Sequence, residues 1–410
     1  MLCTAIACAN GAPPTTSPDP ASIPITGRAV PGMASFDRVI SDLMRRWDIP
    51  GGAVAVVKDG RLVYARGFGY ADLAQRVTVE PDALFRVASV SKPITGAAIL
   101  KLVEEGRLDL DAKAFDLLSR LPPVPGVMVD PRLEAITVRQ LLQHLGGWDR
   151  DQSFDPMFRS TEAAQALGVR SPASAETVIR WMRGKPLEFD PGTRYAYSNF
   201  DYAVLGRIIE TITGQTYEQF VRERVLIPAG ATRMRIARSL EAERFPDEVR
   251  YYHVDSAASV FPGGGTVPWP YGGFFIEAMD AHGGWLASTI DLVRFATAVD
   301  SLPTRPDVLR PESVGLMVFR PSGVWATSPY HYGMGWLVRP GPGNWWHNGS
   351  LPGTASLLVR TGGGLIWAAV FNARAMKPGS TFEQELDPAI WQAVRGVTEW
   401  PVHDLFGQFR

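Results

Sequence analysis

The segment Phe85-Arg-Val-Ala-Ser-Val-Ser-Lys-Pro93 precedes a run of apolar residues at positions 94, 97, 98, 100 and 103. This spacing predicts a buried helix that begins close to Ser89. Residues three apart on a helix share a face, so the Ser89 hydroxyl and the Lys92 amine can approach each other. Of the six lysines in the chain, only Lys92 has a serine three positions earlier. An isolated Ser-x-x-Lys sequence is also typical of a capped surface helix, so its meaning depends on partners elsewhere in the chain.

Ser89 and Lys92 together suit nucleophilic catalysis. A serine hydroxyl is a weak nucleophile and requires an adjacent base that takes its proton as it attacks. A buried lysine loses proton affinity by desolvation, so we expect Lys92 to act as that base or to help create it. The start of a helix also offers free backbone N–H groups to a developing oxyanion. No serine in the chain has a glycine two residues before it, so the Gly-x-Ser-x-Gly elbow of α/β-hydrolases is absent.

A second group of candidate residues is Tyr197-Ser198-Asn199, about 105 residues beyond Lys92 and next to an amphipathic segment from Tyr202 to Thr213 that Gly214 follows. A loop before a helix can present a phenol and an amide to a cleft. Tyr197 is therefore a candidate general base toward Ser89 and a later acid toward the leaving group, and Asn199 is a candidate for orienting a substrate carbonyl. The alternative is a simple helix N-cap, a role that Ser198 or Asn199 fills unaided.

A third group is His347-Asn348-Gly349-Ser350, which directly precedes a strand-like run. Glycine at the crowded point of a strand edge lets a substrate lie against the backbone. The N–H of Ser350 is then a candidate second donor to the oxyanion. The alternative is an ordinary turn ahead of a strand.

With these three segments in this order, the chain resembles the serine β-lactamase and penicillin-binding-protein superfamily, more closely its class C branch and the esterases built on that fold. The resemblance spans about residues 35–395, and it includes the segments 141–147, 283–288 with Asp291, and 332–336. It implies acyl transfer, in which Ser89 forms an acyl-enzyme and Lys92 and Tyr197 act as a coupled base. The N–H groups of Ser89 and Ser350 would form the oxyanion hole.

One departure from the family pattern concerns the third segment. The family usually has Lys-Thr-Gly there, whose cation and hydroxyl help to hold a substrate carboxylate, whereas this chain has His347 and Asn348. A neutral His347 suits an ester substrate better than a penicillin or a peptide carboxylate. His347 has an alternative role in tuning the pKa of Tyr197 or Lys92.

The fold class expected is α+β, with a central antiparallel sheet built from N- and C-terminal strands. The elements expected are a helix over Phe36–Trp47, a hairpin with its turn at Asp59-Gly60, strands at 336–338, 356–359 and 365–371, and a last helix over 386–394. Residues 34–110 and 290–410 would form the sheet domain, and residues 111–289 a mostly helical inserted subdomain. Residues 1–33 are rich in Pro, Ser, Thr, Ala and Gly, which predicts a flexible leader.

Composition excludes several classes of function. The 410 residues carry 41 basic and 42 acidic side chains, which does not favour nucleic acid or an anionic membrane as a partner. The two cysteines, Cys3 and Cys8, lie in a stretch that resembles the end of a secretory signal, so export to the periplasm is favoured over the cytoplasm. The remainder has no apolar run long enough for a transmembrane segment, and we expect no metal and no cofactor.

Two histidines and two aromatic segments remain. We expect His144 to be structural and His282, beside Asp280, to be a satisfied polar group. The segments Val267–Phe275 and Trp345-Trp346 are candidates for lining an apolar acyl pocket, although most aromatic residues in a chain of this size belong to the core.

The function favoured by the sequence is therefore a serine hydrolase, most directly an esterase acting on small or medium acyl esters. A β-lactamase, a D-amino-acid peptidase or another amidase is the alternative within the same chemistry. A catalytically silent ligand-binding relative is the alternative of another class, and the presence of Ser89, Lys92 and Tyr197 together weighs against it.

Overall fold

The computed structural model of the chain describes residues 23–409. Its α-helices are α1 (Ala34–Trp47), α2 (Ser91–Glu104), α3 (Ala114–Leu117), α4 (Val138–Leu142), α5 (Ser160–Leu167), α6 (Ala175–Met182), α7 (Asn199–Thr213), α8 (Tyr217–Val221), α9 (Thr289–Thr297), α10 (Pro311–Met317) and α11 (Phe382–Arg395). Its strands are β1 (Ile25–Thr26), β2 (Gly51–Lys58), β3 (Arg61–Asp72), β4 (Val77–Thr78), β5 (Phe85–Arg86), β6 (Arg235–Ile236), β7 (Ser256–Ala258), β8 (Thr266–Pro268), β9 (Trp285–Ala287), β10 (His331–Tyr332), β11 (Leu337–Arg339), β12 (Asn344–Leu351), β13 (Thr354–Arg360), β14 (Leu365–Phe371), β15 (Met376–Lys377) and β16 (Ser380–Thr381).

A central antiparallel sheet is built from strands at both ends of the chain. Its strand order is β1-β3-β2-β14-β13-β12-β11-β10. The hairpin of β2 and β3 turns at Asp59 and Gly60, which both have positive φ, as a tight two-residue hairpin turn requires. Strand β14 pairs with β2, with Trp367 opposite Val56. The expected α+β class and the joining of N- and C-terminal strands in one sheet are confirmed.

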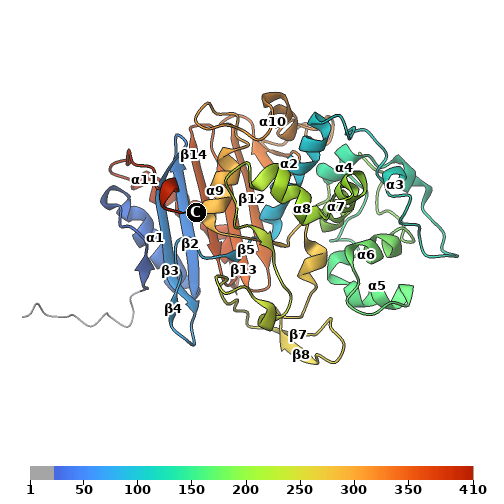
Figure 1. Ribbon diagram of the computed structural model, residues 1–410, viewed down its shortest axis with the longest axis horizontal. Helices are drawn as coiled ribbons and strands as arrows, with labels where there is room; N and C mark the ends of the chain where they lie inside the picture. Colours follow the sequence, from blue (N-terminus) through green and yellow to red (C-terminus); the bar gives the residue numbers. More distant parts are fainter. Residues whose placement is uncertain (1–22, 410) are drawn as a thin grey trace, which may run out of the picture.

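Helices cover both faces of this sheet (Figure 1). Successive side chains of a strand point to opposite faces, so Val54 and Val56 belong to a core shared with α1 and α11. Ala53, Ala55 and Val57 belong to the other core, which includes residues of α2, α7 and α9. Because both faces are covered, β2 is apolar along almost its whole length rather than alternating with polar residues.

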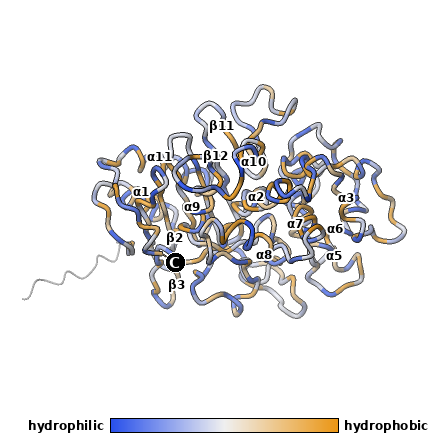
Figure 2. The backbone as a smooth tube through the Cα atoms, turned by 45° about the horizontal axis from the view of Figure 1, so that its top comes forward, coloured by the Kyte–Doolittle hydropathy of each residue, from blue (hydrophilic) through white to orange (hydrophobic). Residues whose placement is uncertain are grey.

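A group of helices lies beside the sheet, on the side where α2 is found (Figure 1). Residues 111–289 contain α3 to α8 and then, from β6 onward, short strands and loops. The helix expected from Tyr202 begins at Asn199, where Ser198 caps it by accepting the N–H of Asp201, and it ends before Gly214 at φ 72°. Figure 2 shows hydrophobic and hydrophilic stretches alternating along these helices.

The expected leader, residues 1–33, lies partly outside the described residues. Cys3, Cys8 and the export signal expected around them lie wholly outside. For residues 23–33 the prediction is wrong. Ile25 in β1 pairs with Phe68 in β3, and Met33 is buried against the first helix. A two-residue strand is too short to produce a sequence period, which is why composition alone indicated a flexible segment. Among residues 23–409, no helix combines the length and the apolar character that a membrane span requires.

The short 3₁₀ helix Ala88–Val90 packs directly on strands β12 and β13. The close approach occurs at Gly349, where a methyl group would lie 2.4 Å from the carbonyl oxygen of Val87 and 2.2 Å from Ser356 Oγ. Ser356 Oγ also donates a hydrogen bond of 2.7 Å to that same carbonyl of Val87. Glycine is therefore required on β12 for the turn that carries Ser89 to reach the sheet.

We predict that Gly349→Ala lowers the free energy of unfolding by about 1–3 kcal/mol, because backbone and a buried hydroxyl must move to accommodate the methyl group. Urea unfolding followed by circular dichroism measures this change. Gly341→Ala is the matched control, since a methyl group there meets no atom within 4 Å. Equal stability of the two variants would contradict this account of the packing.

Candidate active site

Ser89 lies in the 3₁₀ helix Ala88–Val90, immediately before α2. Ala88 has φ 49°, in the left-handed region that non-glycine residues rarely adopt. The Ser91 hydroxyl donates a hydrogen bond of 2.7 Å to the Ala88 carbonyl, and the Val87 N–H donates one of 2.9 Å to Trp285. The turn is thus held from several sides in a strained conformation, a feature that is common at functional sites.

The amine of Lys92 is completely buried and touches segments that are far apart in the sequence. Its Nζ lies 3.1 Å from Ser89 Oγ, 2.7 Å from Asn199 Oδ1 and 3.0 Å from the carbonyl oxygen of His282. Burial lowers the pKa of Lys92 well below its usual value, and the nearby Arg150 guanidinium lowers it further. The side chain therefore favours the neutral amine, which is the form that accepts a proton.

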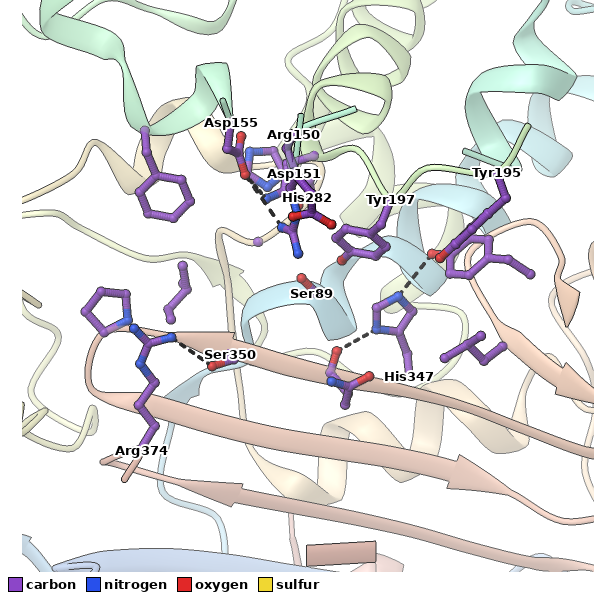
Figure 3. Close-up of a pocket in the computed structure, with 18 of the residues that line it drawn as sticks. Ser89, Arg150, Asp151, Asp155, Tyr195, Tyr197, His282, His347, Ser350 and Arg374 are labelled. Carbon is purple, nitrogen blue, oxygen red and sulfur yellow. Dashed lines mark hydrogen bonds and ion pairs between the residues drawn. The ribbon is translucent and has the colours of Figure 1, made fainter. Parts of the chain in front are cut away.

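Tyr197 lies across the turn from Ser89 (Figure 3). Lys92 Nζ is 4.6 Å from the centre of the Tyr197 ring, and the Arg150 guanidinium is 4.7 Å from it. Burial raises the pKa of Tyr197, whereas the Ser89 hydroxyl and the Arg150 charge oppose this rise. The phenol is therefore protonated at neutral pH, with groups around it that favour its ionised form.

Asn199, the first residue of α7, connects Lys92 to a charged pair. Its Oδ1 accepts from Lys92, and its Nδ2 donates a hydrogen bond of 2.6 Å to Asp155 Oδ2. Asp155 also lies 3.7 Å from Arg150 Nη1. Asn199 thus orients the amine of Lys92, and one of its N–H groups is already engaged.

His144, which the sequence predicts to be structural, packs against the ring of Tyr197. It is completely buried, and its Nδ1 accepts the backbone N–H of Ser198 at 3.2 Å. Its ring packs against Tyr197, Tyr202 and Tyr332. These contacts fix the loop that carries Tyr197.

Residues 347–351, the second half of β12, present an open strand edge toward Ser89. Strand β11 pairs with β12 only as far as Trp346, so residues 347–351 have no strand on that side. A two-residue turn joins Leu351 to Thr354, and residues that flank such a turn exchange backbone hydrogen bonds with each other. Antiparallel pairs alternate, so the N–H of Ser350 points away from β13 toward the open edge. This geometry leaves it available as an oxyanion donor.

His347 lies at the other end of this open edge and is almost completely buried. Its Nδ1 is 2.6 Å from the Asn348 carbonyl oxygen, and its Nε2 is 3.0 Å from the Tyr332 hydroxyl. A neutral ring satisfies both contacts by donating from Nδ1 and accepting at Nε2. Burial, followed by the nearby Lys92, lowers the pKa of His347 to about 3. The ring is therefore uncharged at neutral pH and provides no cation for a substrate carboxylate.

Ser89, Tyr197, Asn199, His347 and Ser350 line one cavity of about 720 Å³ (Figure 3). Its lining joins the three sequence segments with residues from several loops: Ser89, Arg150, Asp151, Asp155, Phe158, Tyr195, Tyr197, Asn199, Trp269, His282, Gly283, Tyr332, Leu337, His347, Asn348, Ser350, Leu351, Pro352 and Arg374. Gly349 lies behind this surface, against the turn of Ser89.

One of the two candidate aromatic segments contributes to the cavity, and the expectation for His282 is wrong. Trp345 is packed in the core and Trp346 faces α11, so neither lines the cavity, whereas Trp269 from the other aromatic segment does. His282 was expected to be a satisfied polar group. Its ring lines the cavity, and its Nε2 is buried without a hydrogen-bond partner among the described residues.

The charged residues of the cavity were not predicted from sequence patterns; they are Arg150, Asp151, Asp155 and Arg374. They lie in loops, where no hydrophobic period marks a residue as facing inward. The available signal was proximity to a quoted segment, since Arg150 follows residues 141–147 almost directly. Within residues 23–409, no group of three or more His, Cys, Asp or Glu side chains is placed to hold a metal ion.

Residues 36–389 match the protein-family model described as Beta-lactamase. Protein flp from Staphylococcus aureus (strain MW2) is 33% identical over 193 residues, which are 47% of this chain and 36% of flp. A D-aminopeptidase from Cereibacter sphaeroides is 29% identical over 303 residues, which are 73% of this chain and 52% of that protein. The matches thus span about a third to a half of the length of these curated relatives.

Solved structures show the same fold. The octameric penicillin-binding protein homologue from Pyrococcus abyssi is 26% identical with a TM-score of 0.66, and the match covers 87% of this chain and 77% of that one. EstCE1, described as a hydrolase with promiscuous acyltransferase activity, is 19% identical with a TM-score of 0.65 over 90% of this chain and 100% of that chain. At the latter identity the similarity shows the fold alone.

We predict that Arg150→Gln moves the acid limb of the pH profile of turnover to higher pH. Arg150 lowers the pKa of both Lys92 and Tyr197. Removing its charge raises both pKa values, so Lys92, the expected base, becomes protonated, and inactive, at a higher pH. The measurement is kcat/KM for a p-nitrophenyl ester between pH 5 and 9.

Arg159→Gln is the matched control for this experiment. Arg159 also lies near an aromatic ring, that of Phe154, and pairs with Glu162, but it is exposed and does not line the cavity. Its profile should coincide with that of the unaltered protein. An acid limb that stays in place in Arg150→Gln would contradict the electrostatic role of Arg150.

Proposed function

The chain belongs to the beta-lactamase family of serine hydrolases, and we propose that it hydrolyses small or medium acyl esters through an acyl-enzyme on Ser89. The observation that carries this proposal is the position of the Lys92 amine, 3.1 Å from Ser89 Oγ and buried among oxygen acceptors. A serine hydroxyl next to a buried amine of lowered pKa is the arrangement that nucleophilic catalysis requires.

The contacts of Lys92 support its role as the proton acceptor. A neutral amine has two N–H groups and one lone pair. Asn199 Oδ1 and the His282 carbonyl oxygen can only accept, so they use the two N–H groups. The lone pair then faces Ser89, whose hydroxyl can donate its proton to it. Tyr197, on the other side of Ser89, completes the coupled base.

The proposed reaction has two halves. In the first, Ser89 Oγ forms a bond to the ester carbonyl carbon while its proton passes to the lone pair of Lys92, and the carbonyl oxygen becomes an oxyanion. The N–H groups of Ser89 and Ser350 stabilise that charge. The carbon–oxygen bond to the leaving alcohol then breaks, and the alcohol takes the proton. In the second half water repeats these steps and releases the acid.

The neutral His347 supports an ester in preference to a β-lactam or a peptide with a free C-terminus. Those substrates carry a carboxylate that the family's Lys-Thr-Gly cation helps to hold. Here the corresponding ring is uncharged, because its pKa is lowered to about 3. An ester needs no such cation, and its alcohol leaves more readily than an amine does.

An amide of an amino acid is the second candidate substrate. Asp151 and Asp155 place two carboxylates on the cavity wall, and a carboxylate there suits the ammonium of an α-amino substrate. The similarity to a D-aminopeptidase supports this candidate. Arg150 weighs against it, because it lies within 4 Å of both carboxylates and already balances their charge.

We predict that the protein turns over p-nitrophenyl butyrate with a higher kcat/KM than D-alanine p-nitroanilide or nitrocefin, and that Ser89→Ala abolishes all three activities while the fold is kept. Steady-state kinetics and circular dichroism measure these outcomes. Ser322→Ala, at an exposed loop position, is the matched control. Retained ester turnover in Ser89→Ala would refute the mechanism, and faster turnover of the anilide would favour the amidase alternative.

A further inference from the structure

Arg374 brings a second guanidinium to the cavity, at the end opposite His347 (Figure 3). It follows the end of β14, and because β12 and β14 run parallel and end at the same side of the sheet, it lies next to Ser350. Its Nη1 donates a hydrogen bond of 3.1 Å to Ser350 Oγ, and that hydroxyl donates one of 2.8 Å to Glu383 Oε1. The charge therefore lies one side chain away from the expected oxyanion donor.

This guanidinium is incompletely satisfied. Among the described residues, no carboxylate forms an ion pair with Arg374, and its Nε is buried without a hydrogen-bond partner. Burial lowers the pKa of Arg374, and the charges of Glu383 and Asp255 oppose this from beyond ion-pair distance. Glu383 also accepts the hydrogen bond of the Ser350 hydroxyl that contacts Arg374. A guanidinium has five N–H donors, so a partly buried one with a neutral hydroxyl as its partner is ready to bind an anion.

Arg150, the other guanidinium of the cavity, is in a different situation. Its Nε lies 3.9 Å from Asp151 and its Nη1 lies 3.7 Å from Asp155, and its plane covers the Tyr197 ring. It is therefore already paired and serves the catalytic groups. Of the two, Arg374 is the one with free capacity for a ligand.

The position of Arg374 also indicates which part of an ester it faces. The leaving alcohol must take a proton from Lys92 or Tyr197, so it points toward the side of Tyr197 and His347, whose rings are 6.2 Å apart. The acyl chain then extends in the other direction, past Ser350 toward Arg374. This step rests on the function proposed above.

We propose that Arg374 binds an anionic group on the acyl part of the substrate, so that the preferred esters are half-esters of dicarboxylic acids. The cation that the family motif places at position 347 of β12 is absent in this chain, and the available cation, Arg374, lies beside Ser350 near the end of that strand. The Lys-Thr-Gly motif would bind a negative charge on the His347 side of the reacting carbonyl. This cavity instead selects a negative charge on the other side, on the acyl part of the substrate.

The test compares esters that share a leaving group and a chain length. The p-nitrophenyl half-ester of adipic acid is compared with p-nitrophenyl hexanoate, and that of suberic acid with p-nitrophenyl octanoate. We expect the acidic ester to have a kcat/KM about tenfold higher at one or both lengths, with an advantage that falls as salt increases. In Arg374→Gln the ratio should fall to about one, and Arg374→Lys should keep part of it.

Arg150→Gln is the matched variant, and it should keep the ratio even if its turnover changes, because Arg150 is already paired. A ratio of one or less at both lengths in the unaltered protein would overturn the proposal. An unchanged preference for the acidic ester in Arg374→Gln would also overturn it, since another cation would then bind the anionic group.

A binding measurement separates failure of this proposal from failure of the ester function. If neither ester is hydrolysed, calorimetric titration with monomethyl adipate and with methyl hexanoate still tests the anion site. Tighter binding of monomethyl adipate that is lost in Arg374→Gln supports it, and equal binding of the two compounds refutes it.

Discussion

The buried amine of Lys92 is the contact on which the site depends. It joins Ser89 in the turn before α2, Asn199 at the start of α7 and His282 in the loop before β9, so three segments far apart in the sequence meet at one nitrogen. A charged amine in such a place would be costly, and the same burial that causes this cost favours its neutral form. The fold thereby places an amine of lowered pKa beside Ser89, as the role proposed for Lys92 requires.

The second constraint is the close contact between the turn of Ser89 and the edge of β12. Only glycine at position 349 allows this approach, and the hairpin turn after Leu351 fixes which N–H groups of β12 face outward. The positions of Ser89, the proposed nucleophile, and of Ser350, the expected oxyanion donor, are thus set by backbone geometry. Side chains at the two ends of the edge determine which charges a substrate meets. A neutral ring stands at one end and a guanidinium at the other.

Much of this arrangement could be predicted from local sequence patterns. The period of apolar residues located α1, the β2–β3 hairpin, β14 and α11, and three short segments located Ser89, Tyr197 and His347. Features without a period were missed or wrong. Strand β1 is too short to show one, and Arg150 and Arg374 lie in loops. Trp345 and Trp346, which were only candidates for the cavity lining, do not line it, because the cavity opens at the edge of β12 whereas their side chains point to its two faces.

The most direct test of the central claim is the location of the acyl group during turnover. The protein is mixed with p-nitrophenyl butyrate, quenched in acid within the first turnovers, digested and analysed by mass spectrometry. We expect a butyryl group, about 70 Da in mass, on Ser89 in the peptide that contains residues 87–92. We expect no butyryl group on Tyr197 or Arg374. A butyryl group on another residue, or rapid ester turnover with Ser89 never acylated, would contradict it.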